Sequence, residues 1–276
     1  MRPVDATGSS GTLFSRGSIW GLQEGDAPME DVVVTFFRDD AGGAPVLVEG
    51  LPGIGHVGKL VADHLIDELG GEKIAEISSV HFPPQVVVDE QGVTHLVNNE
   101  IYRCEKDGVA ILFLVGDFQS TSAEGHYVLA ERYLDLAEAL GVRRIYTLGG
   151  YGVGHLVEHP RVLSAINMER LRPEVEAAGG SFENAGSGGM IMGASGLLLG
   201  LGKARGIEGI CLMGETSGYI VDPRSADSLL TVLSAMIGID IDHTTLQQRA
   251  EAMEQIIANI RETEEARGRE ELNYIG

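Results

Sequence analysis

Residues Gly53–Leu60, which read GIGHVGKL, match the dinucleotide-binding pattern G-x-G-x-x-G and all but the last letter of the phosphate-loop pattern G-x-x-x-x-G-K-[ST]. The octapeptide lies between an apolar run, Val46–Val48, and a segment with helical periodicity, Val57–Leu69. Both motifs require this context, because their phosphates bind at the turn where a helix follows a strand. The stretch therefore predicts a strand, a tight turn and a helix, and it raises two hypotheses of phosphate binding.

Each phosphate-binding motif lacks the residue that its chemistry needs. A phosphate loop requires Ser or Thr after its lysine to hold Mg²⁺, and this chain has Leu60 there. A dinucleotide site requires an acid at the end of the second strand, which here ends in Ser78–His81. We therefore expect the glycines to serve backbone geometry and close packing, and Lys59 to pair with a neighbouring carboxylate or a helix end.

Strand-like and helix-like segments alternate along the chain from Val32 onward. The pattern predicts strands at Val32–Phe37, Val46–Glu49, Ile74–Val80, Val109–Val115, Arg144–Leu148 and Ile207–Met213, and a hairpin of Gln85–Val88 with Val93–Val97. It predicts helices at Val57–Leu69, Ser122–Leu140, Met168–Ala178, Ala194–Ala204 and Ala226–Ile237, and a long helix from Thr244. Such alternation indicates an α/β fold with a mostly parallel sheet flanked by helices.

Four regions follow from this pattern. Residues 1–28 are rich in Gly, Ser, Asp and Ala and predict a disordered leader, with the natural start at Met29. Residues 29–242 form the α/β domain, and residues 243–271 form the C-terminal helix. Residues 272–276 are a short tail. The leader contains no apolar block of the length that a signal peptide or membrane span requires.

The composition indicates an acidic globular protein. The 276 residues include 41 acidic and 20 basic side chains, which gives a net charge of −21. Nucleic acids and anionic membranes are therefore not expected as partners. Cys104 and Cys211 lie within apolar, strand-like runs and predict buried, unreactive thiols in a reducing compartment, which places the protein in the cytoplasm.

Other residue patterns do not add up to a catalytic or metal site. The histidines His56, His64, His126, His155 and His159 are scattered, without the spacing of zinc ligands. Ser195 lies in Gly193–Leu197, which departs from the nucleophile pattern G-x-S-x-G at its last position. We therefore predict no catalytic residue, no metal site and no cofactor.

Six runs of sequence, in order, resemble the archaeal branch of the proteasome assembly chaperone family. They are Glu49–Gly55 with Gly58-Lys59, His81–Gln85, Gly116–Gln119, Leu148–Gly152, Gly193–Gly202 and Gly214–Tyr219. The resemblance extends from about Val32 to the C-terminus. It implies a nucleoside-phosphorylase-like α/β fold, self-association into a homo-oligomer, and binding of proteasome α subunits through C-terminal tails.

The tail Leu272-Asn273-Tyr274-Ile275-Gly276 is the expected partner-binding segment. Family tails resemble the hydrophobic-tyrosine-any motif that proteasome activators insert between α subunits, in which the tyrosine is penultimate. Tyr274 is instead third from the end, which moves the terminal carboxylate one residue outward. Docking through Leu272, Tyr274, Ile275 and Gly276 is a hypothesis: the tyrosine would fill a pocket, and several tails on one oligomer would add avidity.

Two classes of function remain open. The first is an assembly factor without catalysis, which uses its oligomer surface and tail. The second is a nucleotide- or metabolite-binding enzyme, because family members are also described as ATP-grasp enzymes and related phosphorylases bind nucleosides. The residues of the expected crevice are Gly53, Gly55, Gly58, Lys59, Asp117, Tyr151 and Glu215. The sequence shows no cluster of Mg²⁺-binding carboxylates, so the first class is favoured.

Overall fold

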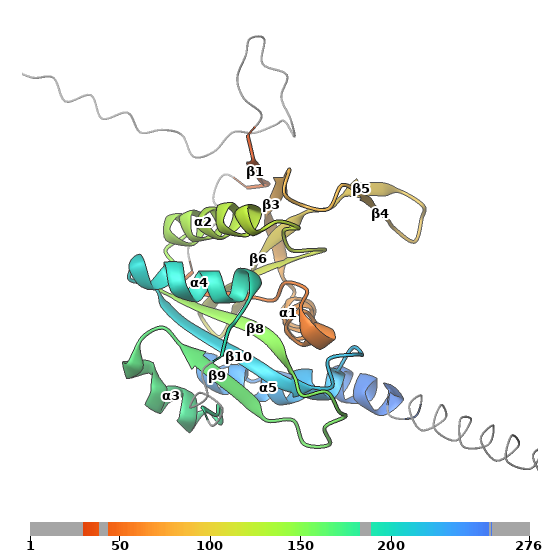
Figure 1. The fold of residues 1–276 in the computed structure, drawn as a ribbon, viewed down its shortest axis with the longest axis vertical. Coiled ribbons are helices and arrows are strands. Elements are labelled where there is room, and N and C mark those ends of the chain that lie inside the picture. Colours follow the sequence, from red (N-terminus) through yellow and green to blue (C-terminus); the bar gives the residue numbers. More distant parts are fainter. Residues whose placement is uncertain (1–29, 39–43, 183–188, 254, 256–276) are drawn as a thin grey trace, which may run out of the picture.

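A mixed eight-stranded sheet, covered by helices, forms the centre of the protein (Figure 1). The computed structural model describes residues 30–38, 44–182, 189–253 and 255. The strand order is β1-β3-β6-β7-β2-β8-β10-β9. The strands are β1 (Val32–Phe36), β2 (Val46–Glu49), β3 (Glu72–Ser79), β6 (Asn99–Lys106), β7 (Val109–Gly116), β8 (Arg144–Gly152), β9 (Val162–Ile166) and β10 (Glu208–Thr216). A separate hairpin consists of β4 (Val86–Val88) and β5 (Thr94–Leu96).

Two helical layers enclose the sheet. The helices are α1 (Val57–Glu68), α2 (Ala123–Ala139), α3 (Arg172–Ala177), α4 (Gly193–Ala204) and α5 (Pro223–Ile237), with short 3₁₀ turns η1 (Ile54–His56) and η2 (Glu169–Leu171). Helices α1 and α5 pack together over one hydrophobic cluster, and α2 and α4 pack together over a second (Figure 1). The predicted α/β fold class is therefore confirmed. None of the helices in the described part of the chain is long and apolar enough to cross a membrane.

The sheet is mixed, which corrects the expectation of a mostly parallel one. Strands β7, β2, β8 and β10 are parallel neighbours, whereas β1, β3 and β6 join at one side and β9 at the other by antiparallel pairing. The antiparallel part follows from the short connection between β6 and β7. Asp107 and Gly108 form this two-residue turn with φ values of 53° and 79°, and Asp-Gly is a preferred hairpin sequence.

The sequence pattern gave no strand range for β6 or β9, although it placed Cys104 of β6 in a strand-like run. Strand β6 carries charged Glu100, Arg103, Glu105 and Lys106, which hide its buried positions Asn99, Ile101 and Cys104 from an apolar-run criterion. Strand β9 has five residues, pairs antiparallel with β10, and makes an isolated parallel bridge between Leu163 and Ser181. The Asp-Gly turn before Val109 was the signal that could have revealed β6.

The C-terminal helix begins where the sequence predicts. Residues 244–253 are helical, and Leu246 is fully buried in the cluster under α1 and α5. Two contacts fix the preceding segment: His64 Nε2 lies 2.8 Å from the backbone oxygen of Asp242, and His243 Nδ1 lies 2.6 Å from Asp227 Oδ1. The start of this helix is thus attached to the body of the domain.

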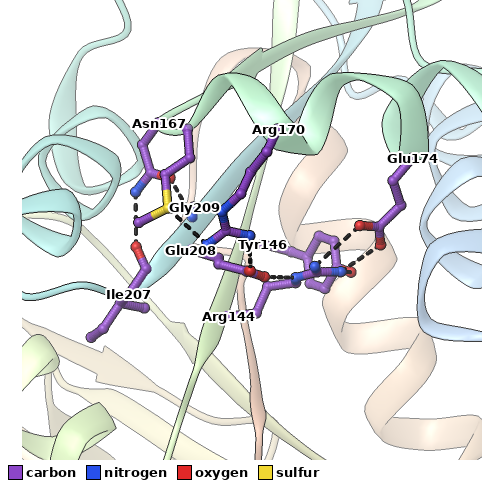
Figure 2. A network of polar contacts seen from close by, with 9 residues as sticks. Arg144, Tyr146, Asn167, Arg170, Glu174, Ile207, Glu208 and Gly209 are labelled. Carbon is purple, nitrogen blue, oxygen red and sulfur yellow. Dashed lines mark hydrogen bonds and ion pairs between the residues drawn. The ribbon is translucent and has the colours of Figure 1, made fainter.

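The amino ends of β8 and β10 are held to α3 by a network of ion pairs. Figure 2 shows Arg144 between two carboxylates: its Nε lies 2.6 Å from Glu208 Oε2, and its Nη1 lies 2.5 Å from Glu174 Oε1. Arg170 donates to the other oxygen of Glu208. Burial alone would raise the pKa of Glu208, but hydrogen bonds from Arg170 and Arg144 outweigh burial and lower that pKa below its usual value. Every charge in this network faces an opposite charge.

Candidate functional site

The glycine-rich turn between β2 and α1 is packed against the sheet. A Cβ at Gly58 would lie 2.3 Å from the backbone oxygen of Leu148 on β8, and a Cβ at Gly55 would lie 2.9 Å from Thr216 Oγ1 on β10. Gly55 also has a φ of 63°, in the left-handed region that favours glycine. These glycines allow the chain to approach β8 and β10 closely, as the sequence led us to expect. By contrast, a Cβ at Gly53 would meet no atom closer than 4.0 Å, the backbone oxygen of Leu51.

Lys59, the basic residue of the turn motif, is paired within α1. Its Nζ lies 3.0 Å from Asp63 Oδ2, one helical turn later. The expectation of a neighbouring carboxylate partner is confirmed. Leu60, at the position where a phosphate loop has Ser or Thr, packs against the hydrophobic cluster under α1. The turn therefore supplies packing and one surface ion pair.

A polar cavity of about 480 Å³ lies beside α1 and the carboxyl end of β7. Helix α1, strands β5, β6 and β7, and the C-terminal helix contribute to its wall. The lining residues are Lys59, Asp63, Ile66, Asp67, His95, Asn98, Glu100, Tyr102, Val115, Gly116, Asp117 and Arg249. The cavity brings together two residues of the expected crevice, Lys59 and Asp117. The other expected residues are outside this lining: Gly53, Gly55, Gly58, Tyr151 and Glu215.

Negative charge dominates the cavity wall. Glu100 accepts hydrogen bonds from Lys73 Nζ at 2.8 Å and from the Tyr102 hydroxyl at 3.0 Å. Burial, and after it the charges of Glu100, Asp63 and Asp67, raise the pKa of Tyr102 above its usual value. The Tyr102 hydroxyl therefore stays protonated at physiological pH and donates its hydrogen bond to Glu100.

Asp117 lines the same cavity, and one of its carboxylate oxygens is closed to solvent. Asp117 is the first residue after β7, and its backbone N–H donates to the backbone oxygen of Asn98 at 3.2 Å. Its Oδ2 atom is buried and has no hydrogen-bond partner within the described residues. A buried carboxylate oxygen without a donor costs free energy, so this atom lowers the stability of the fold at the end of β7.

Tyr151 and Glu215 lie in a different place, at the carboxyl ends of β8 and β10. The two residues are register partners across these strands, and 38% of the Tyr151 surface is exposed. Glu215 accepts a hydrogen bond from Arg161 Nη2 at 2.6 Å. Hydrogen bonds from the Arg161 side chain lower the pKa of Glu215 against the opposing effect of burial. Glu215 is thus an ionised partner of Arg161, in contact with β9.

A buried carboxyl group that the sequence analysis did not select lies at the end of β2. Glu49 is fully buried, and its two oxygens accept from Ser195 Oγ at 2.8 Å and from the Leu51 backbone N–H at 3.0 Å. Burial raises its pKa to about 7, although both hydrogen bonds oppose this change. Its place as the last residue of the buried run Val46–Glu49 was the signal in the sequence.

Gln119 reinforces the same junction. Its Nε2 donates to the backbone oxygen of Pro52 at 2.9 Å, and its Oε1 accepts from the backbone N–H of Ala194 at 3.0 Å. Together with the Glu49–Ser195 hydrogen bond, these contacts join the glycine-rich turn, the loop after β7 and the start of α4. Glu49 and Gln119 therefore hold these three segments together at the carboxyl edge of the sheet.

The remaining predictions concern metals and the tail. Over the described ranges, no three His, Cys, Asp or Glu side chains gather closely enough to hold a metal ion. The tail residues expected to bind a partner, Leu272, Tyr274, Ile275 and Gly276, lie outside the described residues, as does the predicted leader. The buried positions of Cys104 and Cys211 are confirmed, and burial raises the pKa of these thiols to about 11 and about 12.

Together, these features define an α/β protein with a mixed sheet, a glycine-rich turn that serves as a packing element, and a separate acidic cavity. A model of the PAC2 family matches residues 47–261. The chain belongs to the PAC2 family, and its resemblance to archaeal proteasome assembly chaperones is confirmed.

The relatives of this chain include archaeal proteins of known structure. The uncharacterized protein MJ1210 of Methanocaldococcus jannaschii is 40% identical over 84% of this chain and 92% of its own length. Pyrococcus furiosus PbaB, an archaeal proteasome activator, has a TM-score of 0.80 and 37% identity over 84% of this chain and 100% of the PbaB chain. Pyrococcus furiosus PbaA, an archaeal homolog of proteasome-assembly chaperone, has a TM-score of 0.72 and 26% identity over 89% and 98% of the two chains.

Proposed function

We propose that this protein is a proteasome assembly factor that binds proteasome α subunits and acts without catalysis. The observation that carries the proposal is similarity to two archaeal proteasome-related proteins: PbaB, a proteasome activator, at 37% identity and a TM-score of 0.80, and PbaA, a homolog of proteasome-assembly chaperone, at 26% identity and a TM-score of 0.72. The packed turn also supports it. Lys59, the basic residue of the motif, is paired with Asp63 within α1, and Leu60 stands where a phosphate loop has Ser or Thr.

The proposal includes self-association and binding through the C-terminal tail. The helix that begins at Thr244 is anchored to the domain by buried Leu246, so the chain that follows it leaves from a fixed point. In a homo-oligomer each subunit would present one such tail. Several tails on one particle bind with an avidity that one tail lacks, which suits a weak aromatic anchor such as Tyr274.

The test is co-purification of proteasome α subunits with the full chain and with a chain truncated after Glu271. We expect the truncation to lose most of the bound α subunits and to leave the oligomeric state unchanged. Deletion of Gly276 alone is the matched variant, because it makes Tyr274 penultimate; we expect it to bind at least as well as the full chain. Undiminished binding after truncation would refute docking through the tail.

A further inference from the structure

The fold buries the carboxyl group of Glu49 beside neutral partners. None of its surface is exposed, and its hydrogen-bond donors among the described residues are the Ser195 hydroxyl at 2.8 Å and the Leu51 N–H at 3.0 Å. Within the described part of the chain, no lysine or arginine contributes to its pKa. An ionised carboxylate at this position lacks both the water and the counter-ion that would stabilise it. The closed structure therefore favours the protonated form.

The titratable groups that face Glu49 from other elements are neutral as well. They are Tyr133 of α2 and Cys211 of β10, on both of which the charge of Glu49 acts. Burial raises the pKa of each group, that of the Cys211 thiol to about 12, so neither ionises near neutral pH. The Tyr133 hydroxyl donates to Asn99 Oδ1 at 2.5 Å. Its proton is therefore not available to an ionised Glu49.

The segment that leads to Ser195 has the features of a hinge. Gly193, the first residue of α4, has a φ of 75°, and Met192 before it supplies no side-chain cap to the helix. Met190 and Met192 are 93% and 82% exposed, so packing does little to hold them. The chain can therefore turn at Gly193 without pulling large apolar side chains out of the core.

Two hydrogen bonds tie the first turn of α4 to the rest of the domain. Ser195 donates to Glu49, and the Ala194 N–H donates to Gln119 Oε1 at 3.0 Å. Leu198, one turn later, is fully buried and holds the body of the helix in place. Opening of the first turn alone would expose one small apolar side chain, that of Ala194. The Glu49–Ser195 contact is thus well placed to control this turn.

We propose that Glu49 is a proton-controlled lock on the first turn of α4. While Glu49 is protonated, the Ser195 hydroxyl can accept from it and the turn stays closed. When the proton passes to solvent, the carboxylate is left buried without a counter-ion, and the turn opens at Gly193 so that water reaches it. The opening separates Ala194 from Gln119 and changes the carboxyl edge of the sheet. The lock is a property of the isolated chain and does not depend on the proposed binding of α subunits.

Proton linkage gives the direction and the size of the effect. Burial raises the pKa of Glu49 to about 7 in the closed form, whereas contact with water restores the ordinary value of 4.5. Between these values the closed form keeps a proton that the open form has released. The stability of the closed turn is complete below about pH 4.5 and is lost as the pH rises through 7. Within this window each pH unit shifts the opening equilibrium about tenfold.

The experiment is hydrogen exchange of the full-length protein at pH 5.5 and pH 7.5, with rates corrected for the intrinsic effect of pH on exchange. We expect the amides of residues 194–199 to lose roughly tenfold or more of their protection at the higher pH, whereas the amides of β8 and β10 keep theirs. Glu49→Gln should give the same protection at both pH values, because a side-chain amide does not titrate.

Glu90→Gln is the matched control, because it removes an exposed carboxylate at the β4–β5 turn. We expect it to respond to pH as the wild type does. Three results would each overturn the proposal: wild-type protection of residues 194–199 that is constant with pH, an equal response in Glu49→Gln, or an equal loss of protection in β8 and β10. The first and third are read from the wild type alone, so they decide the matter even where Glu49→Gln does not fold.

Discussion

The two ends of the central parallel strands differ in how their charged side chains are paired. At the amino ends of β8 and β10, Arg144 joins Glu208 to Glu174, and each charge has an opposite charge beside it (Figure 2). At the carboxyl ends of β2 and β7, Glu49 is buried among neutral hydrogen-bond donors, and Asp117 has a buried oxygen without a donor in the described part of the chain. The charges at the amino ends are paired, whereas the carboxyl ends hold a buried carboxyl group without a cation and a carboxylate oxygen without a donor among the described residues. Ligand sites in open α/β sheets lie at the carboxyl ends of the strands, in agreement with this difference.

The largest effect on stability should come from a methyl group added at Gly58, near the carboxyl ends of the parallel strands. Gly58→Ala places a Cβ 2.3 Å from the Leu148 backbone oxygen, and backbone cannot move as a flexible side chain does. We expect a loss of about 3 kcal/mol in the free energy of unfolding, measured with urea, although alanine favours a helix more than glycine does. Gly53→Ala, whose Cβ meets only Leu51 O at 4.0 Å, is the control and should change stability by less than about 1 kcal/mol. Similar losses for both variants would contradict the packing role of Gly58.

The buried carboxyl of Glu49 should make stability depend on pH. Its folded-state pKa of about 7 lies above the ordinary value of 4.5, so between these values the folded protein keeps a proton that the unfolded chain has released. The stabilisation is complete below about pH 4.5 and is lost as the pH rises through 7. It amounts to about 3 kcal/mol for a pKa difference of this size.

Glu49→Gln removes this titration and keeps a group that can accept from Leu51 and donate to Ser195. Urea unfolding of both proteins from pH 4.5 to 8 measures the difference directly. We expect the wild type to lose stability relative to the variant as the pH rises. A constant difference between the two curves would show that Glu49 does not titrate in this range.

A smaller effect should follow from breaking the ion pairs at the amino end. Arg144→Met leaves Glu208 and Glu174 without their shared partner, and we expect a loss of about 1–3 kcal/mol at pH 7. Arg170→Met, at a more exposed position, should cost less than about 1 kcal/mol. Both losses should shrink as the pH falls below 4.5 and through the lowered pKa of Glu208, because protonation removes the charge that both arginines face. Equal costs for the two variants would remove the distinction between a central and a peripheral arginine.

The sequence predicted those parts of the molecule that depend on local pattern. Residues Gly53–Leu60 indicated a strand, turn and helix, and the missing Ser or Thr after Lys59 indicated that the turn serves packing. Strand β6 was missed because its four charged residues interrupt the apolar run that would have marked it. The Asp-Gly pair before Val109 is local and was sufficient to predict it.

The candidate site was predicted only in part, because distant segments form it. Lys59 and Asp117 were both selected from the sequence, but their common cavity depends on the packing of α1 beside β7 and on Arg249 of the C-terminal helix. The burial of Glu49 likewise depends on the later segment that carries Ser195, 146 residues away along the chain. Local patterns indicate which residues carry charge, whereas the fold decides which of those charges meet.

The central claim, that this PAC2 family member binds proteasome α subunits, is tested most directly by sedimentation velocity with purified α subunits of the same organism. We predict a complex that sediments faster than either component alone and that a chain truncated after Glu271 forms weakly. Independent sedimentation of the two components at micromolar concentrations, with the full chain folded and oligomeric, would contradict the claim.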